Sequence, residues 1–195
     1  MKKFISIFLF IFLQTLNINA NDFEQIKRIT VGQKNAKITI LAYESLTCSH
    51  CADFHINVFP ELKRDYIDTG IVKIEFRHFP LDIAAFNASK ISQCKNDGDS
   101  KVLNSLYLNQ SKWVKGQTIE DINQNLKKFL VSEAIDLDFN KCTTNKNIED
   151  FILNDRIEGV KKYKVNATPT IIINDKKFEK TLNYKNLKKS LEKLI

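Results

Sequence analysis

Four cysteines offer the clearest chemistry in this 195-residue chain, and two of them, Cys48 and Cys51, stand in a Cys-Ser-His-Cys motif. Such a pair can be redox-active, can be half of a zinc site, or can be an incidental disulfide. An apolar stretch precedes the motif and a helical pattern follows it, so Cys48 should lie at a helix N-terminus. There the free backbone N–H groups and the helix dipole favour a thiolate. The pattern therefore favours redox chemistry, with Cys48 as nucleophile and Cys51 as the buried resolving thiol.

The histidines and the remaining cysteines help to separate these uses. His50 lies inside the motif and is expected to stabilise the thiolate, the alternative being an exposed polar residue at a helix start. His55 is expected at the surface, and His78 in a strand with a satisfied partner. Cys94 and Cys142 have no Cys or His three or four residues away, so the close ligand pairs of a structural zinc site are missing. We expect neither a metal nor a cofactor.

The N-terminus predicts export. Lys2 and Lys3 precede an apolar run over residues 4–16, and Ile-Asn-Ala at residues 18–20 ends in a small residue. This is the pattern of a signal peptide, residues 1–20, removed near Ala20. An uncleaved anchor is the alternative, but the run is shorter than the roughly 20 residues of a spanning helix. We expect a periplasmic domain over residues 21–195, where an even number of cysteines suits an oxidising compartment.

The charge balance suggests no nucleic-acid partner. The formal net charge of the whole chain is +7, and loss of the signal peptide removes two of its lysines. The remaining lysines are scattered among acids, so we interpret them as solvated surface.

Hydrophobic periodicity predicts the elements that position the motif. Residues 37–43 and 71–79 indicate strands. The segment between them is helical, with a kink at Pro60. Residues 81–146 look wholly helical, with Thr118 as an N-cap. The last part predicts a helix ending near Tyr163, strands at 170–173 and 176–178, and a final helix whose apolar face carries Leu187, Leu191 and Leu194.

Three motifs together resemble the DsbA family. They are Ser-Leu-Thr-Cys-Ser-His-Cys at residues 45–51, Phe-Arg-His-Phe-Pro-Leu-Asp at 76–82, and Ala-Thr-Pro-Thr at 167–170. The resemblance covers nearly all of residues 35–195. It implies an α/β, thioredoxin-like fold: a central mixed sheet flanked by helices, with an all-helical subdomain inserted at about residues 81–146.

The resemblance also implies roles for residues far from the motif. Pro169 would be a cis proline beside the redox pair, and Thr168 would offer its backbone to a substrate peptide; an ordinary loop proline is the alternative. We predict a structural disulfide between Cys94 and Cys142, similar to a second pair in some DsbA-like proteins. Two buried free thiols would be the alternative.

The chain also departs from the family. It has Ser49 where members often carry proline, Ala42 where they often carry a buried acid, and Thr168 where the best-known oxidases have valine. Glu44 is near the second of these positions, but we do not equate the two. The departures leave the redox potential and the reoxidising partner open.

The predicted function is that of a monomeric thiol:disulfide oxidoreductase that introduces disulfides into unfolded or reduced exported proteins through a mixed disulfide at Cys48. The resemblance implies reoxidation by a membrane quinone-linked partner. A reductase or isomerase of the same fold is the first alternative. Isomerases of this kind usually need a dimerisation domain, and the segment between residue 21 and the first strand is too short to form one. A binding or holdase module with structural cysteines is the second, and a small-molecule isomerase the third.

Overall fold

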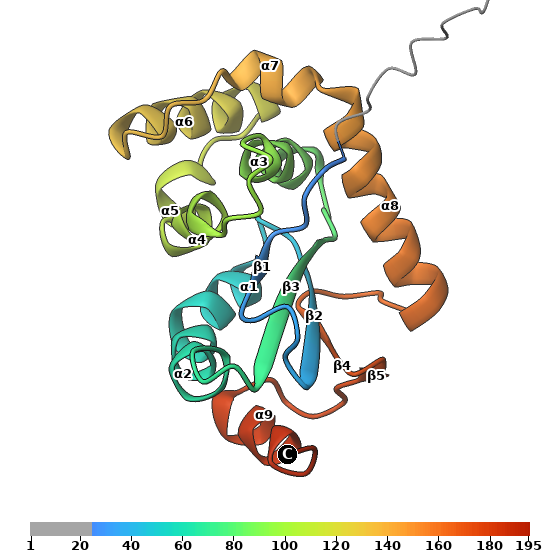
Figure 1. The fold of residues 1–195 in the computed structure, drawn as a ribbon. Helices are drawn as coiled ribbons and strands as arrows, with labels where there is room; N and C mark the ends of the chain where they lie inside the picture. Colours follow the sequence, from blue (N-terminus) through green and yellow to red (C-terminus); the bar gives the residue numbers. More distant parts are fainter. Residues whose placement is uncertain (1–24) are drawn as a thin grey trace, which may run out of the picture.

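The computed structural model describes residues 25–195, so the predicted signal peptide lies outside the described residues (Figure 1). A five-stranded sheet in the order β1-β3-β2-β4-β5 forms the centre. Its strands are β1 (Thr30–Val31), β2 (Ile38–Glu44), β3 (Val72–His78), β4 (Thr170–Ile173) and β5 (Lys176–Lys177). β2 runs parallel to β3, and the other neighbours are antiparallel. The sheet is therefore mixed, as predicted.

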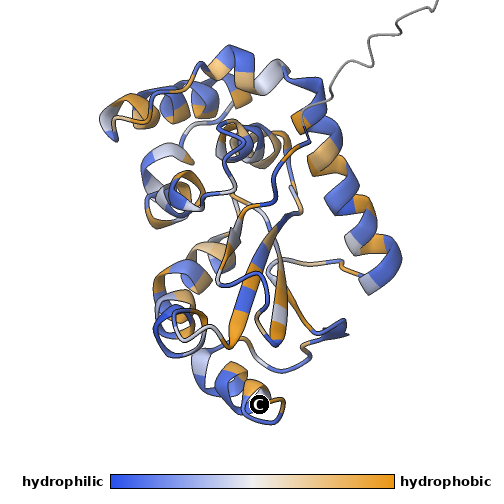
Figure 2. Cartoon of the chain, viewed as in Figure 1, coloured by the Kyte–Doolittle hydropathy of each residue, from blue (hydrophilic) through white to orange (hydrophobic). Residues whose placement is uncertain are grey.

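The central strand β2 carries apolar side chains on both faces, since each face of the sheet is covered by helices. Ile38, Ile40 and Ala42 belong to the larger core, whereas Leu41 and Tyr43 belong to a smaller core on the opposite face. In Figure 2, hydrophobic residues colour much of the central strands orange. β1 was not predicted, because two residues are too few to display an alternating pattern.

The segment after the motif is helical up to Ile67. It consists of α1 (Ser49–Asp53), α2 (Phe59–Leu62) and two π-helical segments, η1 (Phe54–Val58) and η2 (Lys63–Ile67). Pro60 has no N–H to continue an α-helical ladder, and just before it the backbone at Val58 opens to φ −116°. The predicted kink therefore takes the form of a wider, π-helical turn.

The predicted helical block contains five helices, which lie together at the top of Figure 1. They are α3 (Ile83–Gln93), α4 (Lys101–Leu108), α5 (Gln110–Trp113), α6 (Ile119–Ser132) and α7 (Phe139–Thr144). Thr118 caps α6 in a capping box with Asp121, as the sequence predicts. Cys94 and Cys142 form a disulfide that joins the end of α3 to α7.

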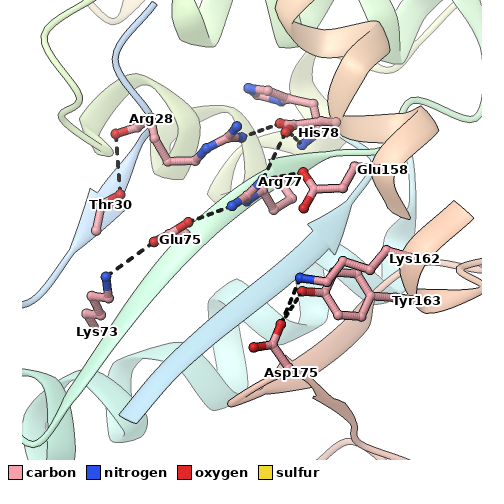
Figure 3. Close-up of polar contacts among 11 residues, drawn as sticks. Arg28, Thr30, Lys73, Glu75, Arg77, His78, Glu158, Lys162, Tyr163 and Asp175 are labelled. Atoms are coloured by element: carbon pink, nitrogen blue, oxygen red, sulfur yellow. Dashed lines mark hydrogen bonds and ion pairs between the residues drawn. The ribbon is translucent and has the colours of Figure 1, made fainter. Parts of the chain in front are cut away.

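Helix α8 (Lys146–Tyr163) covers the face of the sheet opposite α1. Buried Asp155 accepts hydrogen bonds from the side chains of Arg28 and Arg77 and from the backbone N–H of His78. Arg77 also donates to Glu75 and to Glu158 of α8 (Figure 3). A Cβ at Gly159 would lie 2.7 Å from the Tyr43 ring, so only glycine allows this approach. α8 is thus fixed to the sheet, which in turn fixes the loop that leads into β4.

The C-terminal helix α9 (Tyr184–Leu191) packs beside α2. Leu187 and Leu191 are fully buried, but the prediction for Leu194 was wrong. Leu194 lies beyond the end of the helix and is 40% exposed, since the periodicity no longer applies where the helix stops. Among residues 25–195, no helix combines the length and the apolarity that crossing a membrane requires.

Candidate active site

Cys48 is the N-cap residue of α1. Its backbone is extended, and its carbonyl oxygen accepts from the N–H groups of Cys51 and Ala52, which begins the helix. Cys48 is half-buried and Cys51 is buried, and the two are present as free thiols. The Cys48 thiol donates to the carbonyl oxygen of Thr168, 3.3 Å away. The chain thus brings its nucleophile candidate to a helix N-terminus that has one face open to solvent.

The two thiols differ sharply in acidity. A hydrogen bond from the Cys51 thiol, together with the Thr168 side chain and the backbone N–H groups of Cys51 and His50, lowers the pKa of Cys48 to about 5 against the opposing effect of burial. Burial is the main reason that the pKa of Cys51 is raised, and the neighbouring Cys48 and Glu44 raise it further. At neutral pH this site holds one thiolate and one thiol.

His50 itself is placed differently from the expected imidazole–thiolate contact. Its side chain is 81% exposed, and its Nδ1 lies 3.8 Å from an Asp53 carboxylate oxygen. The contribution of His50 to the low pKa of Cys48 comes from its backbone N–H.

A cis peptide bond joins Thr168 to Pro169. Both residues line a surface pocket of about 540 Å³ beside the motif, together with His50 of α1, Phe54 of η1 and Leu182 near α9. The Thr168 hydroxyl is buried, and no group within residues 25–195 meets normal hydrogen-bond geometry with it. Backbone groups next to Cys48 therefore adjoin an open pocket.

The helical block holds the loop in front of the motif. The Gln110 side-chain amide donates to the carbonyl oxygens of Leu46 (2.8 Å) and Cys48 (3.0 Å). Thr47 donates to Asp82, the N-cap of α3, at 2.7 Å. Sequence reasoning missed Gln110, because a glutamine in a short helix gives no local signal of a contact 62 residues away.

The prediction for His55 was wrong, since this residue is 2% exposed. Its ring stacks on Tyr107, and its Nε2 lies 2.9 Å from a carboxylate oxygen of buried Glu44. A signal existed: His55 stands four residues after Cys51 and four before Phe59, on the buried face of the helix. Sequence reasoning had named Glu44 without giving it a role.

No three His, Cys, Asp or Glu side chains within residues 25–195 come together as metal ligands would. The protein thus combines a thioredoxin-like sheet with a Cys-x-x-Cys motif at a helix N-terminus and a cis proline beside the motif. A family model described as Thioredoxin matches residues 24–193, and the chain belongs to that family.

Solved structures place it close to DsbA proteins. The crystal structure of Wolbachia pipientis alpha-DsbA1 is 31% identical, with a TM-score of 0.75 over 86% of this chain and 90% of that one. The chain is DsbA-like in fold and in the arrangement of its helical insertion. BdbD of Bacillus subtilis, at 22% identity and a TM-score of 0.69, shares the fold.

Curated relatives agree with this relationship. Disulfide bond formation protein D of Bacillus subtilis is 26% identical over 175 residues, which are 84% of this chain and 75% of the relative. A Rickettsia bellii relative is 28% identical over 165 residues. The chain spans 61% of the length of that rickettsial protein.

Proposed function

We propose that this protein is a thiol:disulfide oxidoreductase that introduces disulfides into exported proteins. The observation that carries the proposal is the Cys48 sulfur at the N-terminus of α1, half-exposed and surrounded by hydrogen-bonding groups, above a buried Cys51. This environment stabilises a thiolate and so makes it a good leaving group, whereas a structural disulfide has no need of such an environment. The signal-peptide pattern of residues 1–20 supports the export part of the proposal.

The reaction begins with the Cys48–Cys51 disulfide. A substrate thiolate attacks the Cys48 sulfur, the Cys48–Cys51 bond breaks, and its electron pair stays on Cys51, which takes up a proton. A second substrate thiolate then attacks the substrate sulfur of the mixed disulfide, and Cys48 leaves as a thiolate. The substrate loses two electrons and two protons; Cys51 keeps one of the protons and solvent takes the other. A membrane quinone-linked partner would reoxidise the pair.

The acidity of Cys48 supports oxidation of the substrate as the direction of the reaction. Whatever stabilises the thiolate stabilises the reduced pair, and this makes the disulfide a stronger oxidant. The low pKa of Cys48, about 5, therefore favours oxidation of substrates over their reduction. The pocket beside Thr168 and Pro169 supports binding of an extended chain, because it offers both apolar surface and backbone groups.

The equilibrium reduction potential against glutathione tests this direction. We expect a value well above the roughly −270 mV of thioredoxin. A potential near that of thioredoxin would mean that the protein is a reductase and not an oxidase. The substrate class is tested by expressing Cys51→Ser with its signal peptide in a bacterial periplasm. This variant should retain exported proteins as mixed disulfides on Cys48, whereas Cys48→Ser should retain none.

A further inference from the structure

A group of lysines near the C-terminal helix takes no part in the thiol exchange described above. Residues 174–195 contain seven lysines against three acids, Asp175, Glu179 and Glu192. Two of these acids are already paired, Asp175 with Lys162 and Glu192 with Lys188. The segment therefore keeps a strong positive charge after its own ion pairs are formed.

The fold gathers lysines that the sequence intersperses with acids. Five of them define a surface that we call the basic end: Lys176 and Lys177 of β5, Lys180 in the following loop, and Lys189 and Lys193 of the α9 segment. Their side chains are exposed or half-exposed, and within residues 25–195 none of the five pairs with a carboxylate. Figure 1 places β5 and α9 towards the end of the molecule opposite the helical block. Like charges held together repel one another, so this surface favours an anionic partner.

An apolar groove lies within the basic end. It has a volume of about 490 Å³ and runs between the β4–β5 hairpin and the end of α9. Ile173, Phe178 and Leu194 line it together with Lys176, Lys177, Lys180 and the remaining acid, Glu179. Leu194 is 40% exposed. Apolar surface that is rimmed by charged groups is typical of an interaction site.

The chemistry of the basic end fits the surface of an anionic bilayer better than an acidic protein. Its cations are all lysines, and residues 157–195 contain no arginine, the residue that best recognises a carboxylate by two parallel hydrogen bonds. The lysines come from separate elements and surround apolar side chains. This arrangement matches a broad layer of phosphate groups above an apolar interior, because lysine stems can lie on apolar surface while their amines stay among the phosphates.

The basic end and the redox site lie at opposite ends of β2. The strand begins at Ile38, next to Lys37, whose Nζ lies 2.6 Å from the main-chain oxygen of Ile195. It ends at Glu44, shortly before Cys48, and a strand of this length spans about 23 Å. The groove of the basic end shares no lining residue with the pocket beside Pro169. A bilayer that covers the basic end would therefore leave Cys48 open to solvent.

We propose that the basic end docks this protein reversibly on bilayers that contain anionic phospholipids. The lysines bind the phosphate groups, and Phe178 and Leu194 enter the outer edge of the acyl layer. Docking keeps the protein at the membrane with Cys48 directed away from it. The inference goes beyond thiol exchange and does not depend on the direction of that reaction.

Co-sedimentation with lipid vesicles tests the docking, with protein purified from a bacterial periplasm after export. We expect binding to vesicles of equal parts phosphatidylglycerol and phosphatidylcholine, little binding to pure phosphatidylcholine, and release at high salt. In Lys176→Gln/Lys180→Gln/Lys193→Gln the affinity should fall about a hundredfold, since each lysine near such a surface contributes about fivefold. Leu194→Ser should weaken binding about fivefold, because less apolar surface enters the bilayer.

The matched control is Lys95→Gln/Lys115→Gln/Lys128→Gln, which removes the same charge from exposed positions in and around the helical block. It should bind within about threefold of the wild type, since its lysines lie far from the bilayer compared with a Debye length. Equal losses in the two triple variants would overturn the proposal, because binding would then follow net charge alone.

Two other results would also overturn the docking. Absence of binding, or equal binding to both kinds of vesicle, would exclude a site for anionic lipid; an N-terminal anchor would give the second result. Capture of a polyglutamate peptide without vesicle binding would reassign the basic end to an acidic protein partner. Oxidation of a soluble peptide should stay at the wild-type rate in every variant, so a failure of thiol chemistry counts against the proposed function and not against the docking.

Discussion

The molecule contains two cysteine pairs with opposite environments. Cys48 and Cys51 are three residues apart at the start of one helix, and one sulfur is open to solvent while the other is buried. Cys94 and Cys142 are 48 residues apart, join two helices, and are bonded to each other. Backbone N–H groups and a neighbouring thiol stabilise a charge on Cys48.

The contrast shows that the position of a cysteine in the fold controls its reactivity. A pair can exchange electrons only if one sulfur is accessible and stable as a thiolate. A pair that closes a long loop contributes instead by restricting the unfolded chain. The comparison can be tested by removing each pair and the groups that make them different.

The largest effect should come from Cys48→Ala. We expect thiol oxidation of a reduced peptide to fall at least about a thousandfold, to the uncatalysed rate, because the nucleophile is missing. The measurement is the rate of peptide disulfide formation with the oxidised protein. The variant should still fold, as its circular dichroism would show. Residual catalysis would mean that the reactive sulfur lies elsewhere.

The double variant Cys94→Ala/Cys142→Ala should lose stability and keep its chemistry. Closing a loop of this length contributes about 4 kcal/mol in the chain-entropy model. Urea unfolding should show a loss of that order, with peptide oxidation per folded molecule within about twofold of the wild type. A large loss of activity in the folded variant would assign a redox role to the second pair.

The stability of the reduced protein should increase with pH relative to the oxidised protein. The pKa of Cys48 is lowered to about 5 in the folded protein, against an unperturbed value of about 8.5. Between these values the unfolded chain binds a proton that the folded chain does not, so the reduced form gains stability as pH rises and loses it as pH falls through about 5. Thermal unfolding of both forms from pH 4 to 8.5 measures this. The raised pKa of Glu44 affects both forms and largely cancels from the difference. A difference that is flat in pH would contradict the low pKa.

Thr168→Val should raise the pKa of Cys48 by about one unit. The valine has the shape of threonine without the hydroxyl, which is among the groups that lower the pKa of Cys48, and one pKa unit corresponds to about 1.4 kcal/mol. The pH dependence of the alkylation rate of Cys48 measures the change. Thr170→Val, whose hydroxyl bonds to the carbonyl oxygen of Ala167, is the matched control and should leave the pKa of Cys48 unchanged.

Gln110→Ala should have the smallest effect. It removes two hydrogen bonds from the helical block to the loop before the motif, each contributing about 1 kcal/mol. We expect a stability loss of about 1–2 kcal/mol and faster alkylation of Cys48, as the loop loosens. Gln117→Ala, an exposed change in the same block, provides the baseline. Equal alkylation rates in the two variants would show that the block does not restrain the site.

Features that depend on neighbouring residues could be predicted from the amino-acid sequence alone. Alternation predicted β3, and continuous apolar or β-branched runs predicted β2 and β4, in each case to within one residue at either end. The Cys-x-x-Cys spacing after a strand predicted the helix N-terminus at Cys48, since the orphan N–H groups of a helix are a local property.

Contacts between residues far apart in the sequence follow from the tertiary structure and could not be predicted from local patterns. It brought Gln110 to the motif, buried His55 against Glu44, and placed the Thr168 carbonyl at the Cys48 sulfur. The cysteine pairing came from a family resemblance and not from periodicity. These contacts depend on the order of the strands and on the packing of helices that are far apart in the chain. The pattern of a local segment can show that a residue is buried, but it does not show which distant residue it contacts.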